Sequence, residues 1–106
     1  MPNNCIRVCF IGDIVGKIGR KAVREFLEQH NDQYDLVIAN GENASGGKGI
    51  TPRHLDDLLS YGVHVITSGN HIWHQKDLLP LMEDYPIIRP ANYPPNTPGK
   101  GSLLWT

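Results

Sequence analysis

The chain has 106 residues, a formal net charge of −1, 40% hydrophobic residues and 20% charged residues, which is ordinary for a globular protein. Its lysines and arginines are scattered, so we expect no strong nucleic-acid-binding patch. No uninterrupted apolar stretch approaches the roughly 20 residues of a membrane span, so we expect no membrane partner. A chain of this length is expected to fold as a single domain over residues 1–106.

The start of the chain and the two cysteines bear on the compartment. Residues 1–4 do not resemble a signal peptide, because a charged segment followed by an apolar core is missing. Cys5 and Cys9 fall on one predicted strand, about 13 Å apart, which is too far for a disulfide between them. Unpaired cysteines are typical of reducing compartments, so the sequence predicts a cytoplasmic protein.

The first half of the chain contains two predicted strands and a helix. Residues 6–11 form an apolar run that ends at Gly12, and its near-continuous apolarity favours a strand buried on both faces of a parallel sheet. Residues 18–30 repeat apolar side chains every three or four positions, as an amphipathic helix does. A turn at residues 31–33 leads to the second predicted strand at residues 36–39.

The first predicted helix also carries a group of cations. Arg20, Lys21 and Arg24 lie between its apolar positions. They can form a phosphate-binding patch, but this arrangement is more typical of a solvated helix face, and we interpret it so.

The second half begins with a clear helix signal. Thr51 is a good N-cap and Pro52 suits the first helical position, while Gly62 predicts the end of that helix. The remaining predictions are a third strand, a short helix, a short fourth strand and a final strand, at residues 63–67, 77–82, 87–88 and 102–106. The order of elements predicts the α/β class, with a mostly parallel sheet sandwiched by helices and joined by right-handed crossovers.

Polar side chains follow each of the three main predicted strands, and a parallel sheet binds ligands beyond the carboxyl ends of its strands. Carboxylate and amide oxygens suit hard or borderline divalent ions, and a carboxylate can bridge two of them. The pattern therefore predicts a metal-dependent phosphoesterase site, with a histidine placed to donate a proton to the leaving oxygen. We call the five residues the strand-end cluster: Asp13, Glu42, Asn43, Asn70 and His71.

Each member of the strand-end cluster also has a structural interpretation. Asp13 can be a turn or N-cap residue, residues 42–43 can be an ordinary exposed loop, and Asn70 with His71 can form an Asx turn. Their coincidence at three successive strand ends favours a shared site. His74, close by in sequence, is more typical of a capping or solvent-facing residue than of a substrate contact. The glycine-rich residues 46–49 can cradle a phosphate, although they lack the spacing of a P-loop.

Several segments together resemble the YmdB-like family of bacterial calcineurin-like metallophosphoesterases, which are similar to phosphodiesterases of 2′,3′-cyclic nucleotides. The resemblance rests on residues 10–16, 40–44, 47–49, 67–73 and 89–94. It implies the N-terminal half of a calcineurin-like fold, and two divalent ions (Fe, Mn or Zn) in a complete site. It also implies that Asp13, Glu42, Asn43 and Asn70 are metal ligands and that His71 is the proton donor.

Members of that family continue further and supply additional histidine ligands, including a His-x-His pair. None of the five histidines here lies in such a pair. We therefore expect an incomplete metallophosphoesterase domain, with fewer metal ions as one possibility. The apolar end at residues 103–105 would leave an unfinished sheet edge, which predicts self-association or a homo-oligomer.

Three functional hypotheses follow. The first is a dimetal phosphodiesterase that acts on a small nucleotide phosphodiester, a 2′,3′-cyclic nucleotide. The alternative is a non-catalytic fragment or half-site, which needs a partner chain to complete its metal centre. The third is a nucleotide-binding module that uses the glycine loops alone. Whether this chain is itself an enzyme stays open at the level of sequence.

Overall fold

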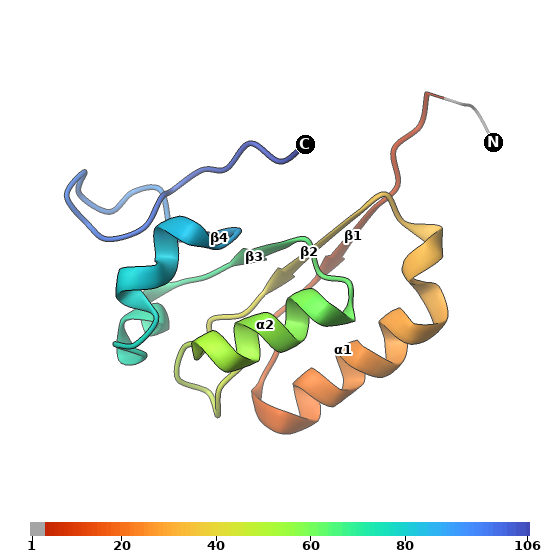
Figure 1. Cartoon of the computed structure of the whole chain (residues 1–106), viewed down its shortest axis with the longest axis horizontal. Coiled ribbons are helices and arrows are strands. Elements are labelled where there is room, and N and C mark those ends of the chain that lie inside the picture. Colours follow the sequence, from red (N-terminus) through yellow and green to blue (C-terminus); the bar gives the residue numbers. More distant parts are fainter. Residues whose placement is uncertain (1–3) are drawn as a thin grey trace.

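A computed structural model of the chain describes residues 4–106, which form a four-stranded parallel sheet with the strand order β1-β2-β3-β4 (Figure 1). The strands are β1 (Val8–Ile11), β2 (Leu36–Asn40), β3 (Val65–Thr67) and β4 (Ile87–Ile88). Helix α1 (Gly16–His30) joins the first two strands and α2 (Pro52–Tyr61) joins the next two. Short 3₁₀ helices complete the chain: η1 (Asn31–Gln33), η2 (Asn70–His74) and η3 (Leu79–Asp84). The α/β class, the parallel sheet and the β-α-β-α-β order of its first three strands are confirmed.

Local signals define α2 as the sequence predicts. The Thr51 side chain accepts a hydrogen bond from the backbone N–H of His54 at 3.2 Å, and Pro52 occupies the first helical position. Gly62 ends the helix in the left-handed conformation, with φ at 117°, and its N–H donates to the carbonyls of Leu58 and Leu59. Helix α1 ends at the predicted residue and begins two residues earlier than predicted.

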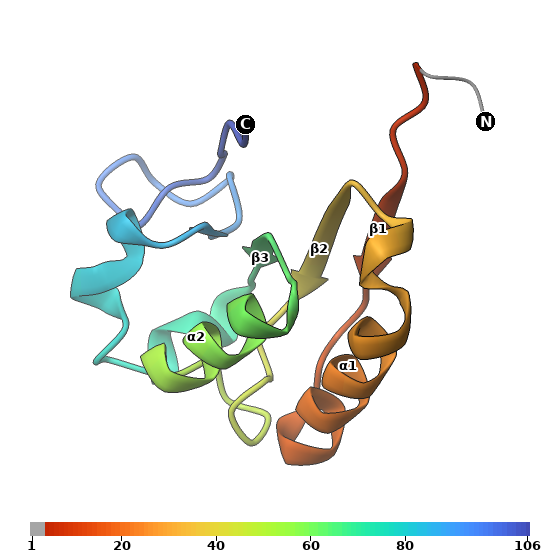
Figure 2. The same ribbon diagram turned by 45° about the vertical axis from the view of Figure 1, so that its right-hand side comes forward.

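The core lies on one face of the sheet. The pairing register aligns Cys9 with Val37 and Ala39 with Ile66, so alternate side chains of neighbouring strands form rows on this face. Both helices pack against it (Figures 1 and 2), as right-handed crossovers in a monotonic strand order require. The central buried side chains are Val23, Leu27, Val37, Ala39, Leu55, Leu58, Ile66 and Ile87.

The prediction that the first strand is buried on both faces is wrong. Strand β1 lies at the sheet edge, and its side chains alternate between exposed and half-buried positions. Val8 is 52% exposed and Phe10 is 62% exposed, because the two helices cover only the opposite face. Helices α1 and α2 therefore form one layer, on a single face of the sheet.

The C-terminal part also departs from prediction. The predicted helix at residues 77–82 is the 3₁₀ helix η3, shifted by two residues. The predicted strand at residues 102–106 is absent. Lys100 makes one isolated bridge to Ile88. Because β4 has only two residues, it has no further backbone groups with which residues 102–106 could pair as a strand. Trp105 lies on the His64 ring instead, with ring centroids 4.9 Å apart.

Two sequence expectations concern the compartment and the membrane. Cys5 and Cys9 are both free, and Cys5 is exposed. The expectation about a signal peptide concerns residues 1–4, of which 1–3 lie outside the described residues. No helix between residues 4 and 106 is long and apolar enough to span a membrane.

Candidate active site

Backbone hydrogen bonds tie the three strand ends together. The N–H of Ile14 donates to the carbonyl of Asn40 at 3.1 Å, and the N–H of Gly16 donates to the carbonyl of Asn43 at 3.0 Å. The N–H of Gly41 donates to the carbonyl of Thr67 at 2.9 Å. The turns after β1, β2 and β3 therefore form one continuous edge, and the strand-end cluster lies along it.

Asn43 connects the first strand end with the third. Its amide Nδ2 donates to both carboxylate oxygens of Asp13, at 3.0 Å each. Its amide oxygen lies 2.5 Å from Nδ1 of His71. Because an amide oxygen can only accept, Nδ1 of His71 carries a proton in this arrangement. The Nε2 atom is then a lone-pair acceptor in the neutral ring and a donor in the charged ring.

Glu42 lies against the third strand end at a glycine. A Cβ atom added to Gly69 would overlap the Glu42 carboxylate, the far end of a flexible side chain, so a side chain there would require the carboxylate to move. The backbone of Glu42 is held on both sides: its N–H donates to the side-chain oxygen of Asn40 at 3.3 Å, and its carbonyl accepts from Gly49. The carboxylate is thereby placed beside the residue that precedes Asn70.

Asn70 is the least constrained member of the strand-end cluster. It is the first residue of η2 and is exposed. Among residues 4–106, no side-chain hydrogen bond holds its amide, which can therefore turn toward a ligand.

The strand-end cluster offers only oxygen donors for a metal ion: the carboxylates of Asp13 and Glu42 and the amide oxygens of Asn43 and Asn70. This set fits a hard or borderline divalent ion, and its two negative charges balance one such ion. The described residues contain no group of three or more His, Cys, Asp or Glu that could hold a metal. In the present geometry Asn43 turns its NH₂ group, not its oxygen, toward Asp13, so its amide would have to reorient to act as a ligand.

The glycine-rich loop brings residues of two strand ends into contact. Gly46, Gly47 and Gly49 all have positive φ values, between 69° and 82°. A Cβ atom on Gly49 would lie 2.6 Å from the carbonyl oxygen of His71. The structure thus gives Gly49 a role in the close approach of two backbones.

The other histidines have identifiable local roles. His74 is exposed, and its Nδ1 lies 3.1 Å from the His71 carbonyl, in line with the capping interpretation. His64 accepts a hydrogen bond from the backbone N–H of Val37 at 2.9 Å. His54 contacts the Ser45 hydroxyl at 2.5 Å, a contact that sequence spacing did not indicate.

Sequence reasoning noted two further residues near this edge but assigned them no role of their own. Gly69 precedes the Asn-His pair, and only its close approach to Glu42 reveals its role. Arg89 follows β4, is 8% exposed and has no carboxylate partner within residues 4–106. Its Nη1 donates to the Pro90 carbonyl at 3.0 Å, whereas its Nε has no partner among the described residues. Arg89 therefore adds a buried positive charge at the carboxyl end of the sheet.

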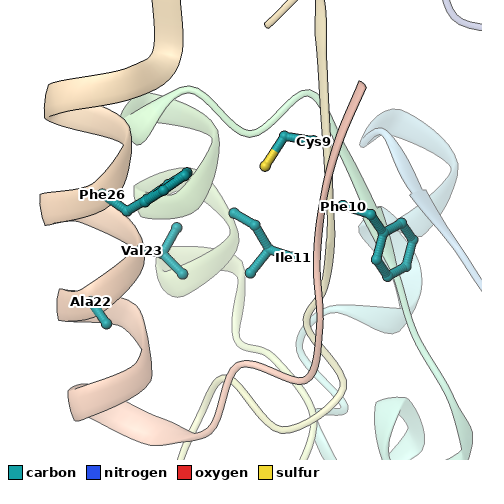
Figure 3. A pocket seen from close by; sticks show the side chains of 6 residues that line it. All are labelled: Cys9, Phe10, Ile11, Ala22, Val23 and Phe26. Atoms are coloured by element: carbon teal, nitrogen blue, oxygen red, sulfur yellow. The ribbon is translucent and has the colours of Figure 1, made fainter. Parts of the chain in front are cut away.

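A cavity of about 310 Å³ lies away from the strand-end cluster, between β1 and α1 (Figure 3). Cys9, Ile11, Val23 and Phe26 line it with almost entirely apolar surface, and no titratable pair meets there. It reflects the incomplete cover of an edge strand, and we assign it no chemistry.

Comparisons with known proteins agree on one family. The family model described as YmdB-like protein matches residues 9–106. A 2′,3′-cyclic-nucleotide 2′-phosphodiesterase of Bacillus subtilis is 43% identical over 91% of this chain and 38% of its own length. The crystal structure of a hypothetical protein from Thermus thermophilus is 50% identical, with a TM-score of 0.88, over 91% of this chain and 38% of that chain. The crystal structure of a Mycoplasma pneumoniae phosphatase has the same TM-score at 39% identity, over 97% of this chain and 39% of that chain. The chain thus spans well under half the length of these relatives.

Proposed function

The chain belongs to the YmdB-like protein family, and on that premise we propose that its strand-end cluster is part of the metal centre of a phosphodiesterase that hydrolyses 2′,3′-cyclic nucleotides. The observation that carries the proposal is the hydrogen-bonded series of Asp13, Asn43 and His71, which joins two candidate metal ligands to the candidate acid. The B. subtilis relative, at 43% identity, is named for this reaction.

In this proposal Asp13, Glu42, Asn43 and Asn70 hold divalent ions of Fe, Mn or Zn. A bound ion supplies Lewis-acid polarisation of a phosphoryl oxygen and an activated water. His71 donates a proton to the leaving oxygen of a small nucleotide phosphodiester. In the present geometry Asn43 accepts the Nδ1 proton of His71, and a turn of the amide that brings its oxygen to an ion would give up this hydrogen bond.

A second candidate function is a half-site that binds one ion and needs further ligands from another chain. The charge of the strand-end cluster favours it, since two carboxylates balance a single divalent ion. The share of the relatives' length also supports treating residues 1–106 as part of a larger metallophosphoesterase domain. Elemental analysis of Mn²⁺-loaded protein separates the two candidates: two firmly held ions per chain argue against the half-site.

The proposed activity is tested by turnover of 2′,3′-cyclic AMP by Mn²⁺-loaded protein. His71→Ala is expected to lower kcat by about 10²–10⁴-fold while metal content stays unchanged, because the general acid is lost and the ligands are retained. His74→Ala is the matched control, since it removes a neighbouring exposed imidazole, and it should leave kcat unchanged. Equal rates for wild-type protein and both variants would contradict the assignment of His71.

We also propose that the protein works in the cytoplasm. The support is the free state of Cys5 and Cys9, which suits a reducing compartment.

A further inference from the structure

A second cavity, of about 220 Å³, lies between α1 and α2, which run side by side (Figure 2). We call it the interhelical groove. Five cations line it and only one carboxylate does, namely Lys17, Arg20, Lys21 and Arg24 of α1, Arg53 of α2, and the acid Asp57. The sequence pattern alone favours a solvated face on α1. The structure adds a cation from α2 on the opposite wall, so the charges converge on one cavity.

Most of this positive charge is not neutralised. Lys21 and Arg24 each approach a glutamate of their own helix, but at 3.9 Å and with exposed side chains. Such surface pairs are weak and leave the cation available to a ligand. Within the described residues, no carboxylate lies at salt-bridge distance from Lys17, Arg20 or Arg53.

Two of the groove's polar side chains are held in place. Nη1 of Arg20 donates to the carbonyl of Ala44 at 2.5 Å, which fixes the guanidinium and leaves its other N–H groups for a ligand. On the other wall, Ser45 Oγ accepts the N–H of Thr51 at 2.9 Å and contacts Nδ1 of His54. The Ser45 hydroxyl can then donate a hydrogen bond to Nδ1 of His54. In that tautomer the neutral ring carries its N–H at Nε2, where it can donate to a ligand.

The electrostatic environment favours this neutral form of His54. Burial lowers the pKa of His54, and the nearby positive charges of Arg20 and Arg53 lower it further, while Asp57 acts in the opposite direction. The same positive charges that disfavour protonation of His54 would attract an anion to the groove. A guanidinium held by a hydrogen bond, exposed cations and a neutral N–H donor together match the oxygens of a phosphate group.

We propose that the interhelical groove binds a compact, multiply charged phosphate anion of the size of pyrophosphate, either free or as part of a nucleotide. The site is separate from the strand-end cluster, and none of its residues is a candidate metal ligand. It touches the loop that carries Glu42 and Asn43 through two contacts, Arg20 with Ala44 and His54 with Ser45.

The test is calorimetric titration with inorganic pyrophosphate in the presence of EDTA, so that binding through a metal is excluded. Saturable binding is expected, and chloride at matched ionic strength should not compete. Arg53→Gln should weaken the affinity by at least about tenfold, because an exposed cation with no ion pair is removed from the groove wall. Lys76→Gln is the matched control, since it removes one exposed positive charge outside the groove and should leave the affinity unchanged.

Three outcomes would overturn the proposal. They are the absence of saturable binding, equal weakening by Arg53→Gln and Lys76→Gln, or much tighter binding of a single-stranded oligonucleotide than of pyrophosphate. Titration with ADP in place of pyrophosphate distinguishes a nucleotide from the free anion. Persistence of binding in Asp13→Asn protein keeps this result separate from that of the proposed activity, since Asp13 lies outside the groove.

Discussion

At the scale of single residues, Gly69 explains how Glu42 reaches the third strand end. Its φ is −138°, so the backbone does not require glycine, and the Glu42 carboxylate occupies the space that a side chain would take. A sequence pattern can show a glycine before an Asn-His pair, but not what lies against it.

Because the far end of a flexible side chain can move at little cost, Gly69→Ala should change the free energy of unfolding by less than about 1 kcal/mol. The substitution is expected to displace the Glu42 carboxylate from the third strand end. The affinity for Mn²⁺ should fall with it. Gly12→Ala is a suitable control, because a Cβ atom there meets nothing within 4 Å and the backbone has no positive φ. Urea unfolding gives the stability and calorimetric titration the metal affinity. If the two variants behave alike, the contact between Gly69 and Glu42 is unimportant.

Asn43 offers a second test at this scale. Asn43→Asp replaces the donor to Asp13 with a carboxylate, so two like charges would face each other at hydrogen-bond distance. Without metal the variant should lose on the order of 1 kcal/mol of stability, the size of such a repulsion in water. A divalent ion between the carboxylates would reverse the loss, so Mn²⁺ should raise the melting temperature of the variant more than that of the wild type. An unchanged response to Mn²⁺ would argue that the pair does not ligate an ion.

At the scale of secondary-structure elements, features that depend on residues close in sequence were predictable, and features that depend on distant residues were not. Helix α2 was predictable from Thr51, Pro52 and Gly62, because capping depends on residues close in sequence. The exposed face of β1 was not, because an apolar run looks the same whether one face or both are later covered. The strand-end cluster was predictable as polar residues after strands, whereas the hydrogen bonds of Asn43 depend on residues about thirty positions away.

The first turn of α2 supplies a prediction about pH. The pKa of His54 in the folded protein is lowered from 6.5, first by burial and then by Arg20 and Arg53, against Asp57. Between pH 6.5 and the lower pKa of the folded state, the unfolded chain binds more protons at His54 than the folded chain does. The free energy of unfolding should therefore fall as the pH decreases through that range. His54→Gln should flatten this dependence, while His74→Gln, at an exposed site, should not. Urea unfolding between about pH 7.5 and about pH 5.5 measures it.

At the scale of the whole molecule, α1 and α2 cover one face of the sheet, and the opposite face, which we call the open face, is exposed at β1 but buried at Val65 of β3. The pairing register places Val8 beside Leu36 and Phe10 beside Ile38 on the open face. Figure 3 shows the Phe10 side chain on the side of β1 opposite to Cys9 and Ile11, which point toward α1. The sequence predicts self-association from an unfinished edge at residues 103–105. The exposed part of the open face, at β1, is a better place to test that prediction.

Phe10→Gln is therefore expected to reduce self-association at high protein concentration. Because the side chain is 62% exposed, the loss of stability should stay within about 0.5 kcal/mol, as for other surface substitutions. Ile18→Gln provides the control, since Ile18 is 85% exposed but lies on α1, away from the open face. Sedimentation velocity measures both variants. If Ile18→Gln reduces association as much as Phe10→Gln does, general hydrophobicity and not this face is responsible.

The bonds that hold the three strand ends together have a further consequence, for evolution and engineering. They run between backbone atoms of Ile14, Gly41 and their neighbours, and do not depend on the side chains of the strand-end cluster. Exchanging Asp13 or Asn70 for histidine or cysteine would therefore change the preferred metal while the frame persists. The carboxyl edge of this sheet is thus a backbone frame on which the side chains of the candidate metal centre can be replaced one at a time without loss of the fold.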